Sequence, residues 1–530
     1  MQNGTGHTIL LGGVGGDSHS VGLTILRQAL SKNGFQVRYL GTQNRLEDFF
    51  KLAGMCDVVM ISSMDGHTRY YLRDFVELME RYQARTPLWY LGGNLTIGDS
   101  LGYERYFREM GFDRVFVKFT DLRQVLQVLD ADLYAREPVA LSPALWNTPG
   151  PVTAPAVVLP VADEAVDAAE FEQARREVLQ HWKTGAAARH MEESAEFLAR
   201  QPSFPAIQAA SNAGAREILV QPRSGVPLVD HQIRLFSAFK AAGVPVLSYQ
   251  VDSLTRNNNY EGADEAIRES RATGVATLNG FPVINHGVSS LRRVISEVKV
   301  PLQVRHSTRD PRLLAEISYA GGVTSFEGGP ICYNIPYYKE YHLAESIRNW
   351  QYVDRLTGLY HERFGIVLDR EYFGTLTATL IPPCLAIATG ILESVLAVQQ
   401  GVKCVSLGYA ESGNRAQDVA AIRTLRQMAE DFFANLGYRD VQVNTVFHQY
   451  MAAFPDAPER AEELIYNSAV TAKLSGATRV IVKTPVEAYR IPSLEDNVGG
   501  IGLVMRGIAA AAEQTVDETR VLEESFIIRR

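Results

Sequence analysis

Asp17 and His19, close to the N-terminus, have residue types and a spacing that suit metal ligation. They lie in the segment DSHSVG, directly after a strand-like run that ends in GGVGG. One imidazole nitrogen of His19 could bind a metal while Asp17 accepts a hydrogen bond from the other, which fixes the tautomer and raises basicity. Gly22 would let a bulky ligand approach closely. The alternative is an ordinary helix N-terminus capped by Asp17 or Ser18, with an incidental histidine.

Three arginines follow strand-like runs in the second half of the chain: Arg223 in QPRSG, Arg256 in LTRNN and Arg305 in VRHST. Arginine recognises carboxylates through two parallel hydrogen bonds, and each charge-assisted bond contributes about 1.5–3 kcal/mol. The carboxyl ends of the strands of a β/α barrel meet at one mouth, so the three side chains could converge there. They would suit a small molecule with two carboxylates, whereas each arginine taken alone is typical of a surface ion pair.

Further polar candidates surround these arginines. Glu327 in TSFEGG could hydrogen-bond an ammonium group, and Tyr333 and Tyr337 could contact substrate or simply pack as aromatic side chains. Lys483 and Glu487 in KTPVEA have the spacing of an exposed i,i+4 helical pair, in the less favourable order.

Strand-like and helical segments alternate before residue 130, and this pattern predicts a doubly wound parallel sheet. A dinucleotide site is not expected, because Ser18 takes the third glycine position of GxGxxG and the second strand ends without an acidic residue. A phosphoacceptor is also not expected, because Ser62 and Ser63 end the third strand. We expect strands at 8–14, 37–41, 57–63, 87–93 and 114–118, and helices at 21–33, 46–53 and 121–130.

The segment from 135 to 168 is rich in proline and alanine and has no periodicity, which is typical of an extended linker, the alternative being a long surface loop. Beyond it, strand-like runs separated by helical stretches predict a (β/α)8 barrel. We therefore expect an α/β chain with a Rossmann-like domain at 1–132, a linker at 133–167 and a TIM barrel at 168–530. Nine strands are candidates, one more than a barrel needs: 217–223, 245–252, 275–280, 301–306, 323–329, 374–383, 403–409, 440–447 and 479–485.

Composition excludes several classes of protein. The 52 basic and 60 acidic residues among 530 give a net charge of −8, which disfavours a nucleic-acid binder. The sequence contains no run of about 18 apolar residues, so a membrane span is not expected. The four cysteines match no disulfide framework or zinc signature, and the start MQNGTGHTILLGG lacks the basic region of a signal peptide, so we expect a cytoplasmic protein.

Residues 8–130 resemble the cobalamin-binding domain of base-off/His-on cobalamin proteins. The resemblance lies in the DxHxxG segment, in Ser62-Ser63-Met64 and in Gly92-Gly93-Asn94, in the order that this family shows. Met64 replaces the usual leucine, a swap that conserves volume. The resemblance implies that His19 is the axial ligand of cobalt and that the serine and glycine elements hold the nucleotide tail. The implied cofactor-binding residues are Asp17, Ser18, His19, Ser20, Gly22, Ser62, Met64, Gly92, Gly93 and Asn94.

The whole sequence resembles the glutamate mutase (methylaspartate mutase) family, with its small cobalamin-binding and large barrel subunits fused in one chain. The large-subunit resemblance covers about 168–515 and rests on segments such as QPRSGVPL, TRNNNY, RHSTRDPRLLAEI, EGGPICYNIPY and VIVKTPVEA. In that family the large subunit continues beyond the barrel, whereas this chain ends at Arg530. We therefore expect it to lack the C-terminal extension.

The resemblance also implies roles for individual residues. Arg223, Arg256 and Arg305 would clamp the substrate carboxylates, with His306 beside them. Glu327 would hold the amino group, and Tyr333 and Tyr337 would contact the substrate. Gly225, Asn279, Pro336, Phe447, Lys483, Glu487 and Ile491 would contact the coenzyme. Arg305, Glu327, Lys483 and Glu487 are the expected catalytic group.

The implied activity is an adenosylcobalamin-dependent radical rearrangement that interconverts L-glutamate and L-threo-3-methylaspartate, through a glycyl radical and acrylate. The implied assembly is a homodimer through the barrel. Phe326 stands where the family pattern has asparagine, which would change the polarity beside Glu327 and leaves open a related amino dicarboxylic acid as substrate. A corrinoid methyltransferase or a non-catalytic cobalamin sensor would also use a cobalamin-binding domain. The arginines and the KTPVEA segment disfavour the methyltransferase, because methyl transfer needs no adenosyl site. A sensor would not need the barrel.

Overall fold

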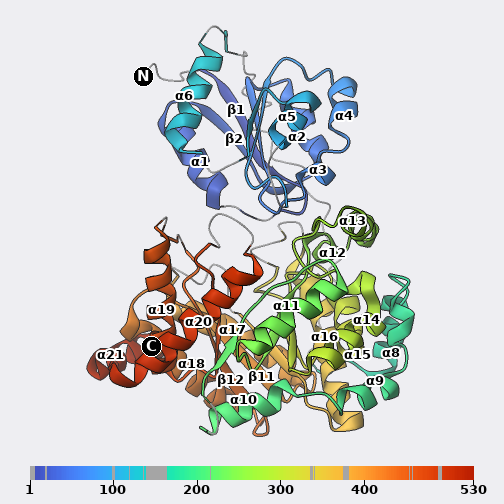
Figure 1. Cartoon of the computed structure of the whole chain (residues 1–530), viewed down its shortest axis with the longest axis vertical. Coiled ribbons are helices and arrows are strands. Elements are labelled where there is room, and N and C mark those ends of the chain that lie inside the picture. The colour runs from blue at the N-terminus through green and yellow to red at the C-terminus, as the bar shows by residue number, and fades with distance from the viewer. Residues whose placement is uncertain are drawn as a thin grey trace. The chain divides into compact units, whose positions relative to one another are not determined.

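The structure of the chain is a computed structural model (Figure 1). It divides into two compact units, Met1–Ala156 with Val275–Asn279 and Val157–Gly274 with Gly280–Arg530, and each is described by itself. The predicted linker falls largely outside the described residues, so its boundaries stay a prediction. The structure describes residues 6–17, 19, 21–97, 102–117, 120–134, 136–138, 164–214, 217–334, 338, 341–373, 381–452, 454–455, 457–486 and 492–530.

The N-terminal unit is a parallel sheet covered by helices on both faces, as predicted. The strand order is β2-β1-β3-β4-β5. Side chains that alternate along β1 separate two cores: Ile9 and Leu11 pack with α1 and α6, whereas Leu10 packs with α2, α4 and α5. The elements are β1 (Thr8–Val14), α1 (Val21–Lys32), β2 (Gln36–Asn44), α2 (Leu46–Ala53), β3 (Val58–Ser62), α3 (Thr68–Tyr71), α4 (Phe75–Arg81), β4 (Leu88–Gly92), α5 (Tyr103–Met110), β5 (Arg114–Phe116) and α6 (Leu122–Leu133).

The second unit contains eight parallel strands in the order β6-β13-β12-β11-β10-β9-β8-β7. A single bridge between Arg223 and Ser248 joins the two end strands, so the barrel is nearly closed. Its strands are β6 (Leu219–Gln221), β7 (Leu247–Gln250), β8 (Leu302–Arg305), β9 (Ser325–Glu327), β10 (Asp369–Tyr372), β11 (Cys404–Ala410), β12 (Gln442–His448) and β13 (Arg479–Ile481).

Helices surround these strands. Before and between the first strands lie α8 (Ala168–Val178), η1 (Gly185–Ala188), α9 (Met191–Leu198), α10 (Phe204–Asn212), α11 (Val229–Ala241), α12 (Ser253–Arg256), α13 (Tyr260–Thr273), α14 (Val283–Val298) and α15 (Arg312–Ala320). The later ones are α16 (Leu343–Phe364), α17 (Pro383–Gln399), α18 (Arg415–Asn435), α19 (Pro458–Ser475), α20 (Leu494–Ala510), η2 (Ala511–Glu513) and α21 (Glu518–Arg529).

One of the nine predicted barrel strands was wrong, and another falls largely outside the described residues. Residues 275–280 are irregular, with bends and no strand, which removes the surplus candidate. Residues 374–380 of the strand predicted at 374–383 lie outside the described part, and the strand between β9 and β11 in the sheet is β10 at DREY. All four β10 residues are buried although three are charged, so the hydrophobic pattern gave no signal for this strand.

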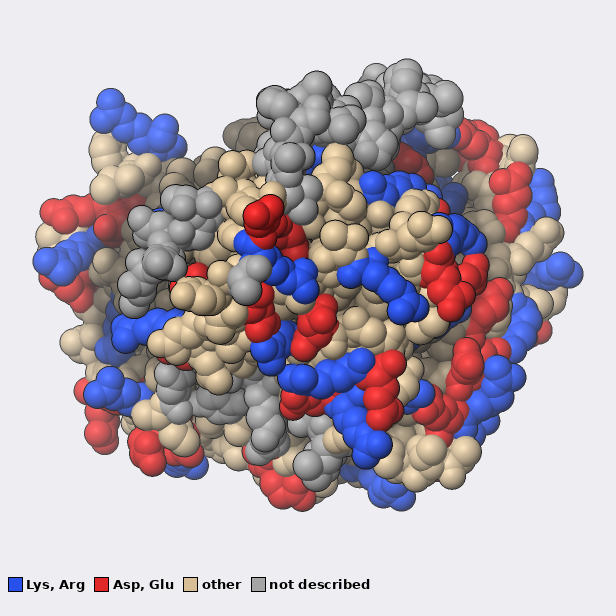
Figure 2. All heavy atoms as spheres, turned by 90° about the horizontal axis from the view of Figure 1, so that it is seen from above, with Lys and Arg blue, Asp and Glu red and all other residues tan. Residues whose placement is uncertain are grey.

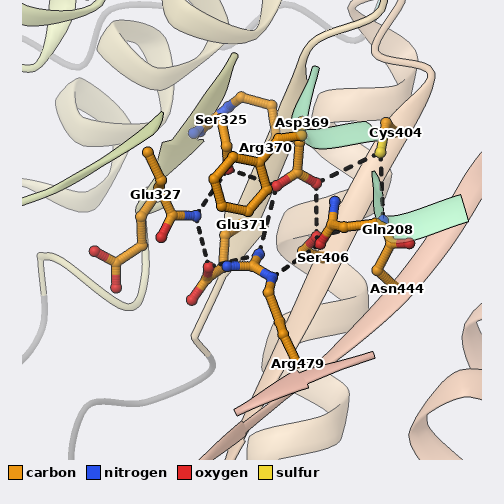
Figure 3. A network of polar contacts seen from close by, with 12 residues as sticks. Gln208, Ser325, Glu327, Asp369, Arg370, Glu371, Cys404, Ser406, Asn444 and Arg479 are labelled. Atoms are coloured by element: carbon orange, nitrogen blue, oxygen red, sulfur yellow. Dashed lines mark hydrogen bonds and ion pairs between the residues drawn. The ribbon is translucent and has the colours of Figure 1, made fainter. Parts of the chain in front are cut away.

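Charged and polar side chains fill much of the barrel interior (Figure 3). Asp369 and Glu371 point inward from β10, and Arg479 of β13 contacts both carboxylates. The helix α10 adds Phe204, whose ring lies under the Arg479 guanidinium, and Gln208, which accepts a hydrogen bond from Arg479 Nε at 2.8 Å. The interior is therefore held by paired charges and amides, which must satisfy one another because water is excluded.

The surface and the cysteines agree with the composition. On the face shown in Figure 2, acidic and basic side chains of the described residues intermingle and neither sign forms a continuous patch. All four cysteines are free thiols. Within the ranges that the structure describes, no helix is long and apolar enough to span a membrane.

Candidate active site

Asp17 and His19 form the contact that their spacing predicts. The Nδ1 atom of His19 lies 2.6 Å from Asp17 Oδ1, and the same oxygen accepts the His19 backbone N–H at 3.0 Å. The other oxygen of Asp17 accepts the Met64 N–H at 2.5 Å, which ties this loop to the loop after β3. The Asp17 carboxylate is buried, whereas the His19 side chain is 61% exposed. The Asp17 contact engages Nδ1, so Nε2 is the ring nitrogen that Asp17 does not occupy.

The neighbouring residues fit a bulky corrinoid. Gly22 has no atom within 4 Å of the position of a Cβ, so the start of α1 is open to a large ligand. The hydroxyl of Ser63 is buried and has no hydrogen-bond partner among the described residues, as expected where a polar ligand group completes the site. Asn94 donates its N–H to Met64 Sδ at 3.3 Å, which joins the loops after β3 and β4. Ser62 and Gly92 end those two strands, whereas Ser18 and Ser20 lie outside the described residues.

A bare metal ion would need several ligands, and among the described residues no group of three or more His, Cys, Asp or Glu side chains could hold one. A cobalt ion carried by a corrin ring needs a single protein ligand, which is the role predicted for His19.

Gly93 is a position where the cobalamin-type loop has no room for a side chain. Its φ is +127°, and a Cβ would lie 2.1 Å from the Ser63 carbonyl oxygen. We expect Gly93→Ala to destabilise the N-terminal unit by about 2–4 kcal/mol, from overpacking and left-handed strain, and to weaken cobalamin binding. Gly102→Ala is the matched control, because its φ is +88° and no described atom lies within 4 Å. Unfolding midpoints and cobalamin titrations of both variants check this, and equal losses would contradict it.

Arg305, Glu327 and Glu371 form the centre of the polar cluster at the barrel mouth. Arg305 donates from NH2 to Glu327 Oε1 at 2.6 Å and from NH1 to Glu371 Oε1 at 3.0 Å. The register pairs Glu371 with Glu327 on adjacent strands, so two carboxylates share one guanidinium. All three side chains are almost fully buried. Such a site suits a ligand that carries both carboxylate and ammonium groups.

The surroundings give the two carboxylates different protonation behaviour. Burial raises the pKa of Glu327 to about 6, and Glu371 adds to the rise while Arg305 and a hydrogen bond with Tyr333 oppose it. Burial would also raise the pKa of Glu371, but Arg305 and Arg479 outweigh it and hold that pKa well below its usual value. Glu371 is therefore a permanent anion, and Glu327 is the carboxyl that can titrate near neutral pH.

The other predicted clamp residues lie at the same end of the barrel. The charge of Arg223 acts on both Glu327 and His448. Arg256 ends α12 and donates from NH1 to Ser307 Oγ at 3.1 Å, while its buried Nε has no hydrogen-bond partner among the described residues. An unpartnered guanidinium N–H inside a mouth lined by polar groups is a further indication of an anion site.

His306 lies in an aromatic environment and not among the inward-facing charges. Its ring packs edge-on against Phe326 and Tyr333 and stacks on Trp350. Burial, with Arg370 adding to the effect, lowers the pKa of His306 well below its usual value, so the ring is neutral. The predicted contact of His306 with substrate stays a prediction. Its Nδ1 accepts the Thr308 N–H at 3.0 Å.

Phe326 does not change the polarity beside Glu327 in the way the sequence suggested. Alternation along β9 places it on the opposite face of the strand from Glu327. It is fully buried there and packs against His306, Tyr319 and Trp350. The substitution therefore alters the packing beside His306, and the alternative substrate stays a prediction.

The predicted coenzyme contacts are only partly described. Gly225 closely approaches the backbone of Gly280 and Phe281. Asn279 lies in the segment between α13 and α14, Phe447 is fully buried in the main core, and Lys483 follows β13 and is buried. The roles of these four residues stay predictions. Pro336, Tyr337, Glu487 and Ile491 lie outside the described residues.

Sequence reasoning missed Glu371, Arg479 and His448. The Nε2 atom of His448 lies 3.4 Å from Glu371 Oε1, and burial lowers the pKa of His448 to about 3, so it is neutral. These residues come from three different strands that are far apart in sequence, so no motif joined them. They could have been found by aligning β10, β12 and β13 as barrel strands and selecting the alternate residues that face the interior.

Glu393 of α17 anchors the segment that carries Tyr333. Its Oε1 accepts the backbone N–H groups of Ile331 and Cys332 at 2.7 and 2.8 Å. A Cβ on Gly329 would lie 2.5 Å from the same oxygen, so a glycine is needed there. Oε2 is buried without a hydrogen-bond partner among the described residues. Burial raises the pKa of Glu393 to about 7 despite the two amide bonds and the nearby Arg370.

This raised pKa predicts a pH-dependent stability. A carboxyl whose pKa is higher in the folded state stabilises the fold at low pH, and that contribution is lost as the pH rises from about 4.5 through 7. Glu393→Gln keeps an acceptor for both amides but cannot ionise, so it should gain stability relative to the wild type between pH 5 and 8, by up to about 3 kcal/mol. Urea unfolding across this range measures the gain, with the exposed Glu430→Gln as control. A difference that does not vary with pH would contradict the expectation.

The fold and site define a class: a barrel with buried arginine and glutamate side chains at its mouth, in one chain with an α/β unit of the cobalamin-binding type. Comparison with family models agrees with this class. Residues 204–530 match the methylaspartate mutase E chain (MutE), and residues 7–126 match the B12 binding domain. The chain belongs to the methylaspartate mutase E chain family and carries its B12-binding domain in the same polypeptide. It is a mutase of the cobalamin-dependent class.

Individual relatives give the same assignment. The glutamate mutase epsilon subunit of Treponema denticola is 44% identical over 360 residues, which are 67% of this chain and 74% of the relative. The epsilon subunit of Desulfitobacterium hafniense is 44% identical over 364 residues, which are 68% of this chain and 75% of the relative. A solved cobalamin-binding protein from D. hafniense DCB-2 is 20% identical over 24% of this chain and 58% of that chain, with a TM-score of 0.20 on which no argument rests.

Proposed function

We propose that the chain is an adenosylcobalamin-dependent isomerase that interconverts L-glutamate and L-threo-3-methylaspartate. The observation that carries the proposal is the Arg305–Glu327 pair at the barrel mouth, where an anion-binding and a cation-binding group lie 2.6 Å apart in a buried site. An amino dicarboxylate presents the complementary charges. The relatives named as glutamate mutase epsilon subunits support this choice of substrate.

The cofactor, when bound, supplies a 5′-deoxyadenosyl radical that abstracts hydrogen from the substrate. His19 would hold the cobalt through Nε2, with Asp17 fixing the ring through Nδ1. Arg223, Arg256 and Arg305 would bind the two carboxylates, and Glu327 would accept hydrogen bonds from the ammonium group. Lys483, buried after β13, would contact the adenosyl group together with Glu487.

The chain's own contribution is to orient the substrate and to exclude water. Holding a reacting centre in position lowers the barrier by removing translational and rotational freedom, an effect that reaches about 7–11 kcal/mol in favourable cases. The interior below Arg305 is filled by interlocked polar side chains such as Gln303, Glu371 and Arg479. This rigid base would keep fragments of the substrate from separating.

The test is direct turnover. The purified chain is incubated with adenosylcobalamin and L-glutamate, and 3-methylaspartate is measured by chromatography while cob(II)alamin is followed by electron paramagnetic resonance. Product together with a substrate-dependent paramagnetic signal supports the proposal. If a panel of other amino dicarboxylates is turned over and glutamate is not, the substrate assignment fails.

His19→Ala removes the side chain that would hold the cobalt of the cofactor. The Asp17 partner would remain buried beside Met64, so the loop has reason to keep its position. We expect cobalamin affinity to fall at least about tenfold, as for losses of metal-site partners, and the nitrogen hyperfine splitting from histidine to disappear from the cob(II)alamin spectrum. An unchanged spectrum in the variant would show that another group ligates the cobalt.

A further inference from the structure

Glu371 occupies the centre of the inward-facing cluster, and its two oxygens are engaged on different sides. Oε1 accepts from Arg305 NH1 at 3.0 Å and lies 3.4 Å from His448 Nε2. Oε2 accepts from Gln303 Nε2 at 2.8 Å and lies 2.8 Å from Arg479 NH2. The side chain is completely buried and has polar partners from four other strand positions. These four partners therefore fix the position of the Glu371 carboxylate.

Glu327 is held far less completely than Glu371. It pairs with Arg305 NH2 at 2.6 Å and shares a hydrogen bond with Tyr333, and it is the last residue of β9 at the mouth of the barrel. The two carboxylates thus engage different nitrogens of the same guanidinium. Glu371, which contacts NH1, is also held by Arg479 and Gln303. Glu327, which contacts NH2, lies at the end of β9 at the mouth of the barrel.

We propose that Glu371 is a positioning residue that keeps Arg305 in place through NH1, while substrate binding exchanges the partners of Arg305 NH2 and Glu327. In this exchange the Arg305–Glu327 pair opens. Arg305 NH2 then binds a substrate carboxylate, and Glu327 accepts the substrate ammonium group. This inference rests on the proposed amino dicarboxylate substrate. It adds Glu371 as the residue that holds Arg305 in position.

Charge balance supports the exchange. Opening the pair inside a buried site leaves Glu327 without a cation and Arg305 NH2 without an acceptor unless the ligand supplies an ammonium and a carboxylate group. A zwitterionic amino acid with a side-chain carboxylate does so, whereas a ligand with carboxylates alone would leave Glu327 without a cation. Arg305 keeps a buried anion at all times only because Glu371 remains on NH1.

The test compares Glu371→Gln with Asp369→Asn. Asp369 belongs to the same buried network (Figure 3). It lies 3.4 Å from Arg479 NH2 and accepts hydrogen bonds from Ser325 and Ser406 at 2.6 Å, and among the contacts of the described residues none joins it to Arg305. Without Glu371, Glu327 becomes the sole anion on Arg305 and the pair is harder to open. We expect Glu371→Gln to raise the KM for glutamate at least tenfold with kcat changed less than threefold. Asp369→Asn should lower thermal stability and leave KM within twofold.

A purely structural role for Glu371 would reduce the active fraction of the enzyme and leave KM unchanged, and that result would overturn the proposal. An equal rise of KM in Asp369→Asn would overturn it as well. Wild-type turnover is measured first. If the wild type binds glutamate in calorimetry but does not convert it, the proposed reaction fails while the exchange remains testable by binding.

A second measurement does not depend on the folding of Glu371→Gln. Glutarate has both carboxylates of glutamate and lacks the ammonium group, so in the wild type it must separate Arg305 from Glu327 without replacing the cation. Glu327→Gln removes that ion pair in advance. Calorimetry should therefore show glutarate binding at least tenfold more tightly to Glu327→Gln than to the wild type. Equal or weaker binding to the variant would refute the exchange.

Discussion

Arg305→Lys is expected to lower kcat/KM at least about a hundredfold, equivalent to about 3 kcal/mol. The guanidinium makes hydrogen bonds to Gln303, Glu371 and Glu327 from two nitrogens at 2.6–3.0 Å. A lysine ammonium is a single point on a flexible stem and cannot reproduce this planar fork. One of the two carboxylates would be left without its charge partner in a buried site. Steady-state turnover of glutamate measures the loss.

Arg175→Lys is the matched control for this substitution. Arg175 is also buried, and it contacts Glu316 through Nε and NH2 at 2.9 and 3.2 Å, but it lies in α8 outside the barrel interior. Both variants should lose stability, because each weakens a buried ion pair. Only Arg305→Lys should change the KM for substrate. If the two variants lose activity in proportion to their loss of stability, Arg305 has no specific role in binding.

The sequence predicted those strands whose residues show an apolar pattern. All five strands of the N-terminal sheet and seven of the eight barrel strands overlap predicted segments, because runs such as TILLGGV and KCVSLGY bury apolar side chains. The DREY strand was missed because its inward carboxylates are neutralised by arginines from β8 and β13. Only the closed barrel brings these charges together, and local pattern analysis cannot register that pairing.

The candidate site also contains contacts that the sequence could predict and contacts that it could not. Asp17 and His19 are two residues apart in one loop, so their contact could be predicted from spacing alone, and the structure confirms it. Arg305 and Glu327 could be placed at strand ends, but their direct ion pair could not, because it depends on the register of β8 and β9. Phe326 shows that two residues adjacent in sequence need not have neighbouring side chains. Its neighbour in sequence is Glu327, yet strand alternation separates the two side chains.

Glu327→Gln is expected to abolish the main pH dependence of substrate binding as well as most of the activity. Glu327 must be ionised to pair with an ammonium group, and its pKa is raised to about 6 by burial. In the wild type, kcat/KM for glutamate should therefore rise as the pH increases through about 6 and be lost below it. The amide cannot ionise, so the variant should show a flat profile there and a kcat/KM lower by about a hundredfold, or about 3 kcal/mol.

Glu316→Gln separates this effect from a general response of the barrel to pH. Glu316 is a buried carboxyl paired with Arg175 and hydrogen-bonded by Tyr352, away from the mouth. Its loss should reduce stability and leave the inflection near pH 6 in place. If the inflection persists in Glu327→Gln, the titrating group is a different one. Arg305 and Arg479 keep Glu371 ionised, and burial keeps His448 neutral. Neither Glu371 nor His448 would therefore account for an inflection near that pH.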